Sequence, residues 1–359
     1  MVAAVTVGLA PPGVAQSVPR GQASRVATLT GAASINETEA RYAVKGTDLG
    51  IMWTDERGQI LAAFGDTFGA GWTGPPGTVS ADPAAIDWRS NTLARSTDHN
   101  PADGMSFTDF VSDRPGHAKE LVPSLKRDGI EMSTIPTGGV NVGGRNYLAY
   151  MSVRHFGQPG QWTTNYSGVA YSDDGGRTWQ DALGTRRLNS PGLDEKFQMI
   201  AYTRRDGFVY AFCTPNGRFG DAYVARVPEQ RLLDLSAYQY WTGQTWLPGA
   251  SATAAAIVHG PVGELSVRYD QILKSWEMMT LDESRGAIVV RLAPEPTGPW
   301  GAPIPVATAS QYPHLYGGFL NPDSSGSDIY FTMTQYDRYN VSLMHAKLPP
   351  TPANPATAP

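Results

Sequence analysis

Asp48 and Asp66 are the residues in this sequence whose type and spacing could do chemistry, and each lies in a short glycine-bounded run. Apolar stretches at 51–53 and 60–64, separated by a turn at 55–59, predict two antiparallel strands between them. The start of one strand and the end of the next lie at the same end of a hairpin, so the two carboxyl groups are expected together. Two carboxyl groups at one rim are the minimum that hydrolysis of a glycosidic bond requires.

A structural interpretation accounts for the same two residues. Aspartate is common at strand ends because its carboxylate accepts hydrogen bonds from the nearby backbone in Asx turns. The pair of residues alone does not separate this interpretation from the catalytic one.

Polar and aromatic residues in several predicted loops and at strand starts could bind a sugar, since aromatic faces suit sugar rings and amides suit hydroxyl groups. Loop scaffolding is the competing interpretation for them. The candidate substrate-binding residues are Arg89, Asn91, Glu131, His155, Trp162, Asn165, Gln198, Tyr316 and Tyr336.

The composition favours an all-β protein. The 359 residues include 39 glycines and 28 prolines but are only 17% charged, which suits many strands joined by turns. A net charge of -5 and the absence of a dense basic run argue against nucleic-acid binding. A polysaccharide rich in hydroxyl groups is the expected partner of such an aromatic, weakly charged chain.

Signatures of other chemistries are missing. The single cysteine, Cys213, lies in an apolar run and is expected to be a buried core residue. The six histidines lack the spacing of metal ligands, and no phosphate-binding or dinucleotide-binding motif is present. We therefore expect neither a cofactor nor a metal ion.

Short apolar runs recur in five similar units and predict a single domain with the fold of a five-bladed β-propeller. Unit one covers about 40–117, with an irregular insertion after Gly69. The fifth unit lacks an outer strand, and the run 25–29 is expected to supply it and close the ring. The remaining units are centred on the runs 132–136, 146–153 and 167–172; 197–202, 208–213 and 222–227; 264–269, 275–281 and 287–292; and 316–320, 328–334 and 339–346.

The run 172–179, Ser-Asp-Asp-Gly-Gly-Arg-Thr-Trp, supports this architecture because it matches the Asp-box, a hairpin turn found in propeller blades. Asp174 is expected to accept backbone hydrogen bonds and Trp179 to pack under the hairpin. A propeller gathers the starts of its innermost strands around one face, where ligands bind. The predicted starts are Asp48, Ser133 or Thr134, Gln198, Glu264 and Tyr316.

The two ends of the chain are expected to lie outside the domain. Residues 1–22 contain a short apolar run and a small-residue segment that resemble a signal peptide without its basic region, which predicts a secreted or envelope-associated protein. The run is too short to cross a bilayer. The domain is expected at 23–348, and 349–359 form a tail rich in proline and alanine.

Five motifs resemble those of the family long described as domain of unknown function 4185, now glycoside hydrolase family 183. These are proteins of actinobacteria and their phages with five-bladed propellers, among them endo-acting D-arabinanases that cut arabinogalactan and lipoarabinomannan. The resemblance covers most of the chain and maps the two aspartates of the family onto Asp48 and Asp66. The motifs are 46–50, 64–69, 88–91, 165–168 and 339–341.

The resemblance implies an inverting endo-D-arabinofuranosidase that needs no cofactor, and we expect a monomer. One aspartate would protonate the leaving oxygen and the other would activate water, with Asp48 assigned as the base and Asp66 as the acid. The alternatives are a lectin-like propeller that binds carbohydrate without cleaving it, and a hydrolase of another furanoside glycan.

Overall fold

The computed structural model describes residues 22–75 and 85–349, and its regular structure is almost entirely β-strand. The predicted segments 1–22 and 349–359 therefore lie almost wholly outside the described residues. The described helices are one short α-helix and a few 3-10 turns: α1 (Thr38–Tyr42), Leu183–Thr185, Glu229–Arg231, Leu235–Ala237 and Ser251–Thr253.

The first sheet contains the hairpin predicted around the two aspartates. Its strands run in the order β2 (Leu49–Thr54), β3 (Ile60–Phe64), β6 (Thr92–Ser96) and β7 (Asp109–Phe110). Two small ribbons lie beside it: β4 (Thr67–Phe68) with β5 (Trp88–Arg89), and β8 (Ser112–Arg114) with β9 (His117–Ala118).

Two larger sheets follow along the chain. The second contains β10 (Ser133–Val142), β11 (Arg145–Phe156), β12 (Trp162–Ser172), β13 (Gln180–Asp181) and β14 (Arg187–Leu188), the last two both pairing with β12. The third contains β15 (Met199–Arg205), β16 (Phe208–Thr214), β17 (Tyr223–Pro228), β18 (Gln239–Trp241) and β19 (Trp246–Pro248).

The last two sheets have four strands each. The fourth contains β20 (Leu265–Asp270), β21 (Ser275–Asp282), β22 (Ala287–Ala293) and β23 (Ile304–Thr308). The fifth contains β24 (Leu315–Leu320), β25 (Asp328–Gln335), β26 (Asn340–Lys347) and, at its outer edge, β1 (Ser24–Thr28).

Strand β1 joins the two ends of the described chain. It pairs antiparallel with β26, with Ser24 opposite His345 and Thr28 opposite Ser342. The amide of Leu29 continues this pairing by donating to the carbonyl of Val341 at 2.8 Å. The run 25–29, predicted as an outer strand, therefore lies where the sequence analysis expected it.

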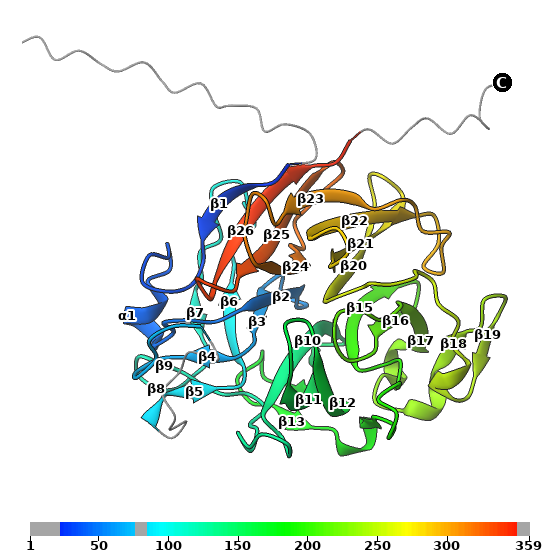
Figure 1. Ribbon diagram of the computed structural model, residues 1–359, viewed down its shortest axis with the longest axis horizontal. Coiled ribbons are helices and arrows are strands. Elements are labelled where there is room, and N and C mark those ends of the chain that lie inside the picture. The colour runs from blue at the N-terminus through cyan, green and yellow to red at the C-terminus, as the bar shows by residue number, and fades with distance from the viewer. Residues whose placement is uncertain (1–21, 76–84, 350–359) are drawn as a thin grey trace, which may run out of the picture.

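The first strands of the five sheets lie around a common centre (Figure 1). Strand β2 contacts β10 and β24. The other contacts between first strands are those of β10 with β15, β15 with β20, and β20 with β24. A cavity of about 280 Å³ lies between them and is lined by residues of all five strands. This all-β arrangement is the one that the recurring apolar runs predict.

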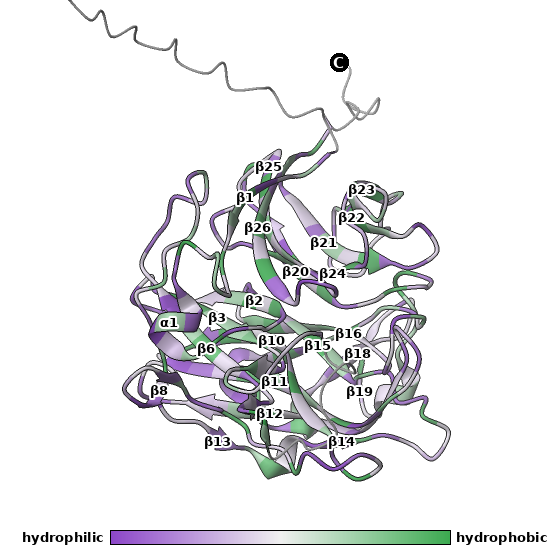
Figure 2. Ribbon diagram, turned by 60° about the vertical axis from the view of Figure 1, so that its left-hand side comes forward, coloured by the Kyte–Doolittle hydropathy of each residue, from purple (hydrophilic) through white to green (hydrophobic). Residues whose placement is uncertain are grey.

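Apolar side chains pack between and within these sheets. Ile60, Phe64 and Leu343 belong to one buried cluster that joins the first and fifth sheets. Cys213 is fully buried in another cluster, which confirms its predicted place in the core. At the periphery, the exposed strands β8 and β13 carry the hydrophilic colour in Figure 2.

The Asp-box forms the predicted hairpin turn. The Asp174 carboxylate accepts from the amides of Arg177 and Thr178 at 2.9 Å each. Gly176 has a φ of +84°, a conformation that glycine adopts without strain. The Trp179 indole donates to the Gly176 carbonyl and packs edge-on against Trp53 at 6.5 Å between ring centroids, so the turn is tied to the first sheet.

Candidate active site

Asp48 and Asp66 lie at the same end of the first hairpin, as the sequence predicts. Asp48 directly precedes β2, and Asp66 lies two residues beyond the end of β3. Leu49 pairs with Phe64, and the Gly65 amide donates to the Asp48 carbonyl at 3.2 Å. The hairpin therefore brings the two aspartates together.

Backbone conformation at the start of β2 fixes the direction of the Asp48 side chain. Leu49 has a φ of +69°, which is unusual for a residue with a branched side chain, and Gly50 follows at +88°. A β-bulge interrupts the pairing between Leu49 and Ile51. A side chain on Gly65 would place its Cβ 2.3 Å from Oδ1 of Asp48, so the carboxyl group fits only because residue 65 is a glycine.

The Asp48 carboxyl group is poorly solvated. Tyr316 donates its hydroxyl to Oδ2 at 2.9 Å, whereas Oδ1 is buried and has no hydrogen-bond partner among the described residues. Burial, followed by the charge of Asp66, raises the pKa of Asp48 to about 8, and the charge of Glu264 adds to the rise. The hydroxyl groups of Tyr316 and Tyr339 oppose it.

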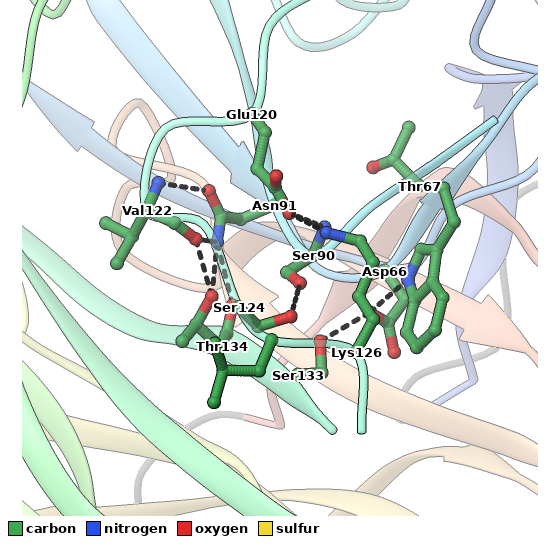
Figure 3. Close-up of polar contacts among 12 residues, drawn as sticks. Asp66, Thr67, Ser90, Asn91, Glu120, Val122, Ser124, Lys126, Ser133 and Thr134 are labelled. Carbon is green, nitrogen blue, oxygen red and sulfur yellow. Dashed lines mark hydrogen bonds and ion pairs between the residues drawn. The ribbon is translucent and has the colours of Figure 1, made fainter. Parts of the chain in front are cut away.

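The Asp66 carboxyl group has a different environment (Figure 3). Its Oδ1 accepts from the Ser133 hydroxyl at 2.5 Å and from the Trp88 indole at 2.8 Å. Burial raises the pKa of Asp66 to about 6, less than for Asp48, because Ser133, Trp88 and the cation of Lys126 oppose the rise. The two aspartates therefore differ in protonation because their surroundings differ.

A segment that we call the strap, residues 119–126, lies against Asp66 and is held by Asn91 (Figure 3). The Asn91 amide accepts from the amides of Leu121 and Val122 and donates to the carbonyls of Val122 and Thr134. Glu120 accepts from the Ser90 amide and pairs with Lys126 at 2.7 Å. The strap thereby places the Lys126 cation near Asp66.

Arg89 and Asn91 were predicted as substrate contacts, but the structure places both in the scaffold. Asn91 is fully buried and Arg89 is 4% exposed. Arg89 donates to the carbonyls of Ala43 and Ala118 and pairs with Asp87. The prediction is corrected on this physical ground, since neither side chain has surface to offer a glycan.

Three of the other predicted strand starts act on the aspartates: Ser133, Glu264 and Tyr316. Ser133 begins β10, Gln198 directly precedes β15, Glu264 directly precedes β20, and Tyr316 is the second residue of β24. Gln198 is fully buried and bonds to Thr164 and to the Arg187 carbonyl, so it too belongs to the scaffold. Tyr316 contacts Asp48 directly.

Three of the remaining predicted contacts lie in strands of the second sheet, His155 in β11 and Trp162 and Asn165 in β12, whereas Glu131 and Tyr336 lie outside the strands. Glu131 accepts from the hydroxyls of Ser152 and Tyr166, and Asn165 donates to the Ile130 carbonyl and to Ser152. His155 is exposed and pairs with Asp128. Trp162 is buried, with an exposed fraction of 8%, whereas Tyr336 is 42% exposed. A sugar contact by these residues remains a prediction.

Sequence reasoning missed Tyr339 and Lys126 as parts of the site. Tyr339 follows β25, and its backbone carbonyl accepts from the Thr47 amide beside Asp48. Both residues have a positive φ, +46° for Tyr339 and +53° for Lys126. The family motif at 339–341 was the available signal for Tyr339, whereas nothing in the local sequence marks Lys126.

The described residues contain no group of three or more His, Cys, Asp or Glu side chains that could hold a metal ion. Within 22–75 and 85–349, no helix has the length and apolar character needed to span a membrane. The titratable pair of the described site consists of two carboxyl groups, and the pKa of Asp48 is raised further than that of Asp66.

Three known proteins resemble this chain in sequence over most of its length. Notoamide biosynthesis cluster protein J of Aspergillus sp. (strain MF297-2) is 32% identical over 84% of this chain and 82% of its own length. Protein J' of Aspergillus versicolor is 33% identical over 81% of this chain and 80% of its own length. An uncharacterized 35.9 kDa protein of Mycolicibacterium smegmatis is 23% identical over 82% of this chain and 88% of its own.

Two solved structures resemble the fold. A hydrolase candidate from Bacteroides ovatus has a TM-score of 0.57 at 14% identity, over 85% of this chain and 86% of that one. A family 117 glycoside hydrolase from Zobellia galactanivorans has a TM-score of 0.53 at 11% identity, over 93% of both chains. The sequence profile of Domain of unknown function (DUF4185) matches residues 33–345, so the chain belongs to that family.

Proposed function

We propose that this protein is a glycoside hydrolase in which Asp48 and Asp66 are the acid and base. The observation that carries the proposal is a pair of buried carboxyl groups at one end of the first hairpin, held by different hydrogen-bond partners, and their surroundings raise the pKa values to about 8 and about 6. Two titratable groups whose surroundings separate their pKa values are the arrangement that acid–base catalysis needs. Fold similarity to a family 117 glycoside hydrolase is compatible with this reading.

The pKa order suggests which residue has which role. Between pH about 6 and about 8, Asp48 holds its proton and Asp66 is ionised. Asp48 would then protonate the leaving glycosidic oxygen, and Asp66 would activate water on the opposite face of the sugar. This assignment is the reverse of the one made from the sequence, where Asp48 was the base.

The proposed substrate is a neutral glycan, specifically D-arabinofuranosyl linkages of arabinogalactan or lipoarabinomannan, cleaved internally and with inversion. Resemblance to glycoside hydrolase family 183 supports the linkage. The charges near the site support neutrality, since Lys126 pairs with Glu120 and Arg218 pairs with Glu264 and Glu283. A secreted or envelope-associated location would give the enzyme access to this substrate.

We further infer that the five sheets are the blades of a five-bladed propeller that β1 closes. The contacts between first strands follow a cyclic order that returns from β24 to β2. The pairing of β1 with β26 supports closure, because it completes the last sheet with the start of the chain. A closed ring would place the start of β2, at Asp48, beside the start of β24, at Tyr316, on one face.

The test is release of new reducing ends from a panel of glycans. Wild-type protein, D48N and D66N are incubated with arabinogalactan, lipoarabinomannan and an L-arabinan. A small aryl D-arabinofuranoside is added as a substrate that lacks the polymer. We expect cleavage of the D-arabinans by the wild type and a loss of at least about 1,000-fold in each variant.

Asp55→Asn is the matched control, since Asp55 lies at the turn of the same hairpin, away from the pair, and accepts from the amides of Arg57 and Gln59. Binding of the glycans without new reducing ends would favour the lectin-like alternative. Cleavage of only another furanoside would mean that the substrate is that glycan and not a D-arabinan. Full activity in a D48N/D66N double variant would exclude this aspartate pair.

A further inference from the structure

Arg218 lies in a loop of the third sheet between β16 and β17 and contacts Glu264, Tyr316 and Trp162. Glycines make room for it: Cβ atoms added at Gly160 and Gly263 would lie 3.3 and 3.4 Å from its side chain. Gly217 has a φ of +81°, and the Arg218 amide donates to the Gly160 carbonyl at 2.9 Å. The side chain is only 15% exposed, so the backbone holds this cation in a defined place.

The guanidinium group of Arg218 binds Glu264 with both oxygens engaged. Nε donates to Oε1 at 3.0 Å and to Oε2 at 3.1 Å, and Nη2 donates to Oε1 at 2.8 Å. Nη1 reaches Glu283 at 3.3 Å. A planar guanidinium bonded in this way has a fixed orientation, which a lysine in its place would not have.

The same guanidinium lies over two aromatic rings. Its Cζ atom is 5.0 Å from the ring centroid of Tyr316 and 5.7 Å from that of Trp162. Tyr316 begins the fifth sheet, Trp162 belongs to the second, and Glu264 precedes the fourth. Arg218 thus connects its own sheet to three others, and one of its contacts is the tyrosine that donates to Asp48.

We propose that Arg218 is a positioning residue, which holds the Tyr316 hydroxyl against Oδ2 of Asp48 and offsets the charge of Glu264 beside the aspartate pair. This inference rests on the proposed function of Asp48 and Asp66, and it assigns a role that the sequence analysis gave to neither Arg218 nor Glu264. Cation–π contact with the ring restricts the tyrosine, and the bidentate ion pair restricts the cation.

Ionisable groups surround both Asp48 and Arg218. Asp48 is faced by Asp66, Glu264, Tyr316 and Tyr339, and the charge of Glu264 raises its pKa. Arg218 is the cation bonded to Glu264, and it opposes the rise in the pKa of Tyr316. Removing Arg218 alone would leave Glu264 buried without a partner, so the test removes both charges together.

The first test needs no substrate and follows the Asp48 carboxyl group in protein labelled with 13C at the aspartate carboxyl carbon. NMR titrations are compared for wild type, E264Q and R218Q/E264Q, with the Asp48 signal assigned by its loss in D48N. We expect E264Q to lower the pKa of Asp48 and R218Q/E264Q to raise it relative to E264Q. The E283Q variant, which removes the other carboxylate bonded to Arg218, should titrate like wild type.

A purely structural Arg218 predicts a different result: R218Q/E264Q would lower Tm while its Asp48 titrated as in E264Q, and this would overturn the inference. The second test is kinetic. On a glycan that the wild type cleaves, R218Q/E264Q should lower kcat about 100-fold and keep KM within about twofold of the wild-type value. The alkaline limb of its pH profile should move in the same direction as the pKa of Asp48 measured by NMR. Unchanged kcat would also overturn it.

The two tests separate the inference from the proposed function. If the wild type cleaves no glycan but the Asp48 titration shifts as expected, the proposed function fails and the positioning of Asp48 by Arg218 stands. If the wild type is active and neither readout responds to R218Q/E264Q, the inference fails alone.

Discussion

Oδ1 of Asp48 lies against the backbone of Gly65, without a hydrogen-bond partner among the described residues, and this carboxyl group is where the site departs furthest from ordinary solvation. The strained φ of Leu49 holds it there. Unfavourable conformations of this kind persist where the surrounding structure imposes them. At this scale the site is defined by poor solvation of one aspartate and good hydrogen bonding of the other.

The raised pKa of Asp48 predicts how stability depends on pH. Burial takes this pKa from 3.8 to about 8, so the native state keeps a proton that the unfolded chain releases. The free energy of unfolding should therefore fall as the pH rises from about 4 to about 8. This decrease should be on the order of a few kcal/mol, and it should be absent from the D48N variant. Urea denaturation at several pH values measures it.

The comparison with Asp66 provides the control for this prediction. Because the pKa of Asp66 is raised only to about 6, D66N should flatten the curve over a narrower range, from about pH 4 to about pH 6. A wild-type curve with the same slope as that of D48N would contradict the burial of a protonated Asp48.

Ser133→Ala should raise the pKa of Asp66, because the serine hydroxyl donates to its carboxylate at 2.5 Å and favours the ionised form. The acid limb of the pH profile should move to higher pH, and the lost charge-assisted hydrogen bond should cost about 1.5–3 kcal/mol. The matched variant is Ser124→Ala, whose hydroxyl contacts Ser90 rather than Asp66 and should leave the acid limb in place.

At the scale of elements, the strap depends on one buried amide. Asn91→Asp keeps the shape but turns the hydrogen bonds donated to the carbonyls of Val122 and Thr134 into repulsion between a carboxylate and those carbonyls. We expect a loss of about 3–5 kcal/mol in the free energy of unfolding, and faster hydrogen exchange at Leu121 and Val122.

An exposed asparagine supplies the comparison for the strap variant. Asn100→Asp should change the free energy of unfolding by no more than about 1 kcal/mol, since Asn100 is exposed. Equal effects of the two substitutions would mean that Asn91 does not hold the strap.

The sequence predicted the elements better than the contacts between them. The hairpin of Asp48 and Asp66, the Asp-box and the starts of the first strands were all accessible, because each depends on turn residues and local apolar patterns. Arg89 and Asn91 were misread, since a polar residue in a loop does not reveal whether its partners are backbone groups or solvent. The contact of Arg218 with Tyr316 joins distant parts of the chain, which no local pattern encodes.

At the scale of the whole molecule, β1 is the strand on which a complete fifth sheet depends. Leu29, just beyond it, is 1% exposed and packs in the cluster of Ile60 and Leu343. Leu29→Ala should cost about 2–5 kcal/mol, and deletion through Gly31 should lower Tm much further. Arg25→Ala, at an exposed position of the same strand, is the control, and a deletion that leaves Tm unchanged would contradict closure by β1.

The pairing of Ser24 with His345 also has a consequence for synthesis of the protein on the ribosome. Strand β1 is made long before its partner β26, and at about 5–20 residues per second the delay is on the order of tens of seconds. During that time β1 lacks its partner strand, so the nascent chain carries an unpaired strand until β26 emerges. In a chain that stops before β26, strand β1 would stay unpaired, and the protein would be prone to aggregate.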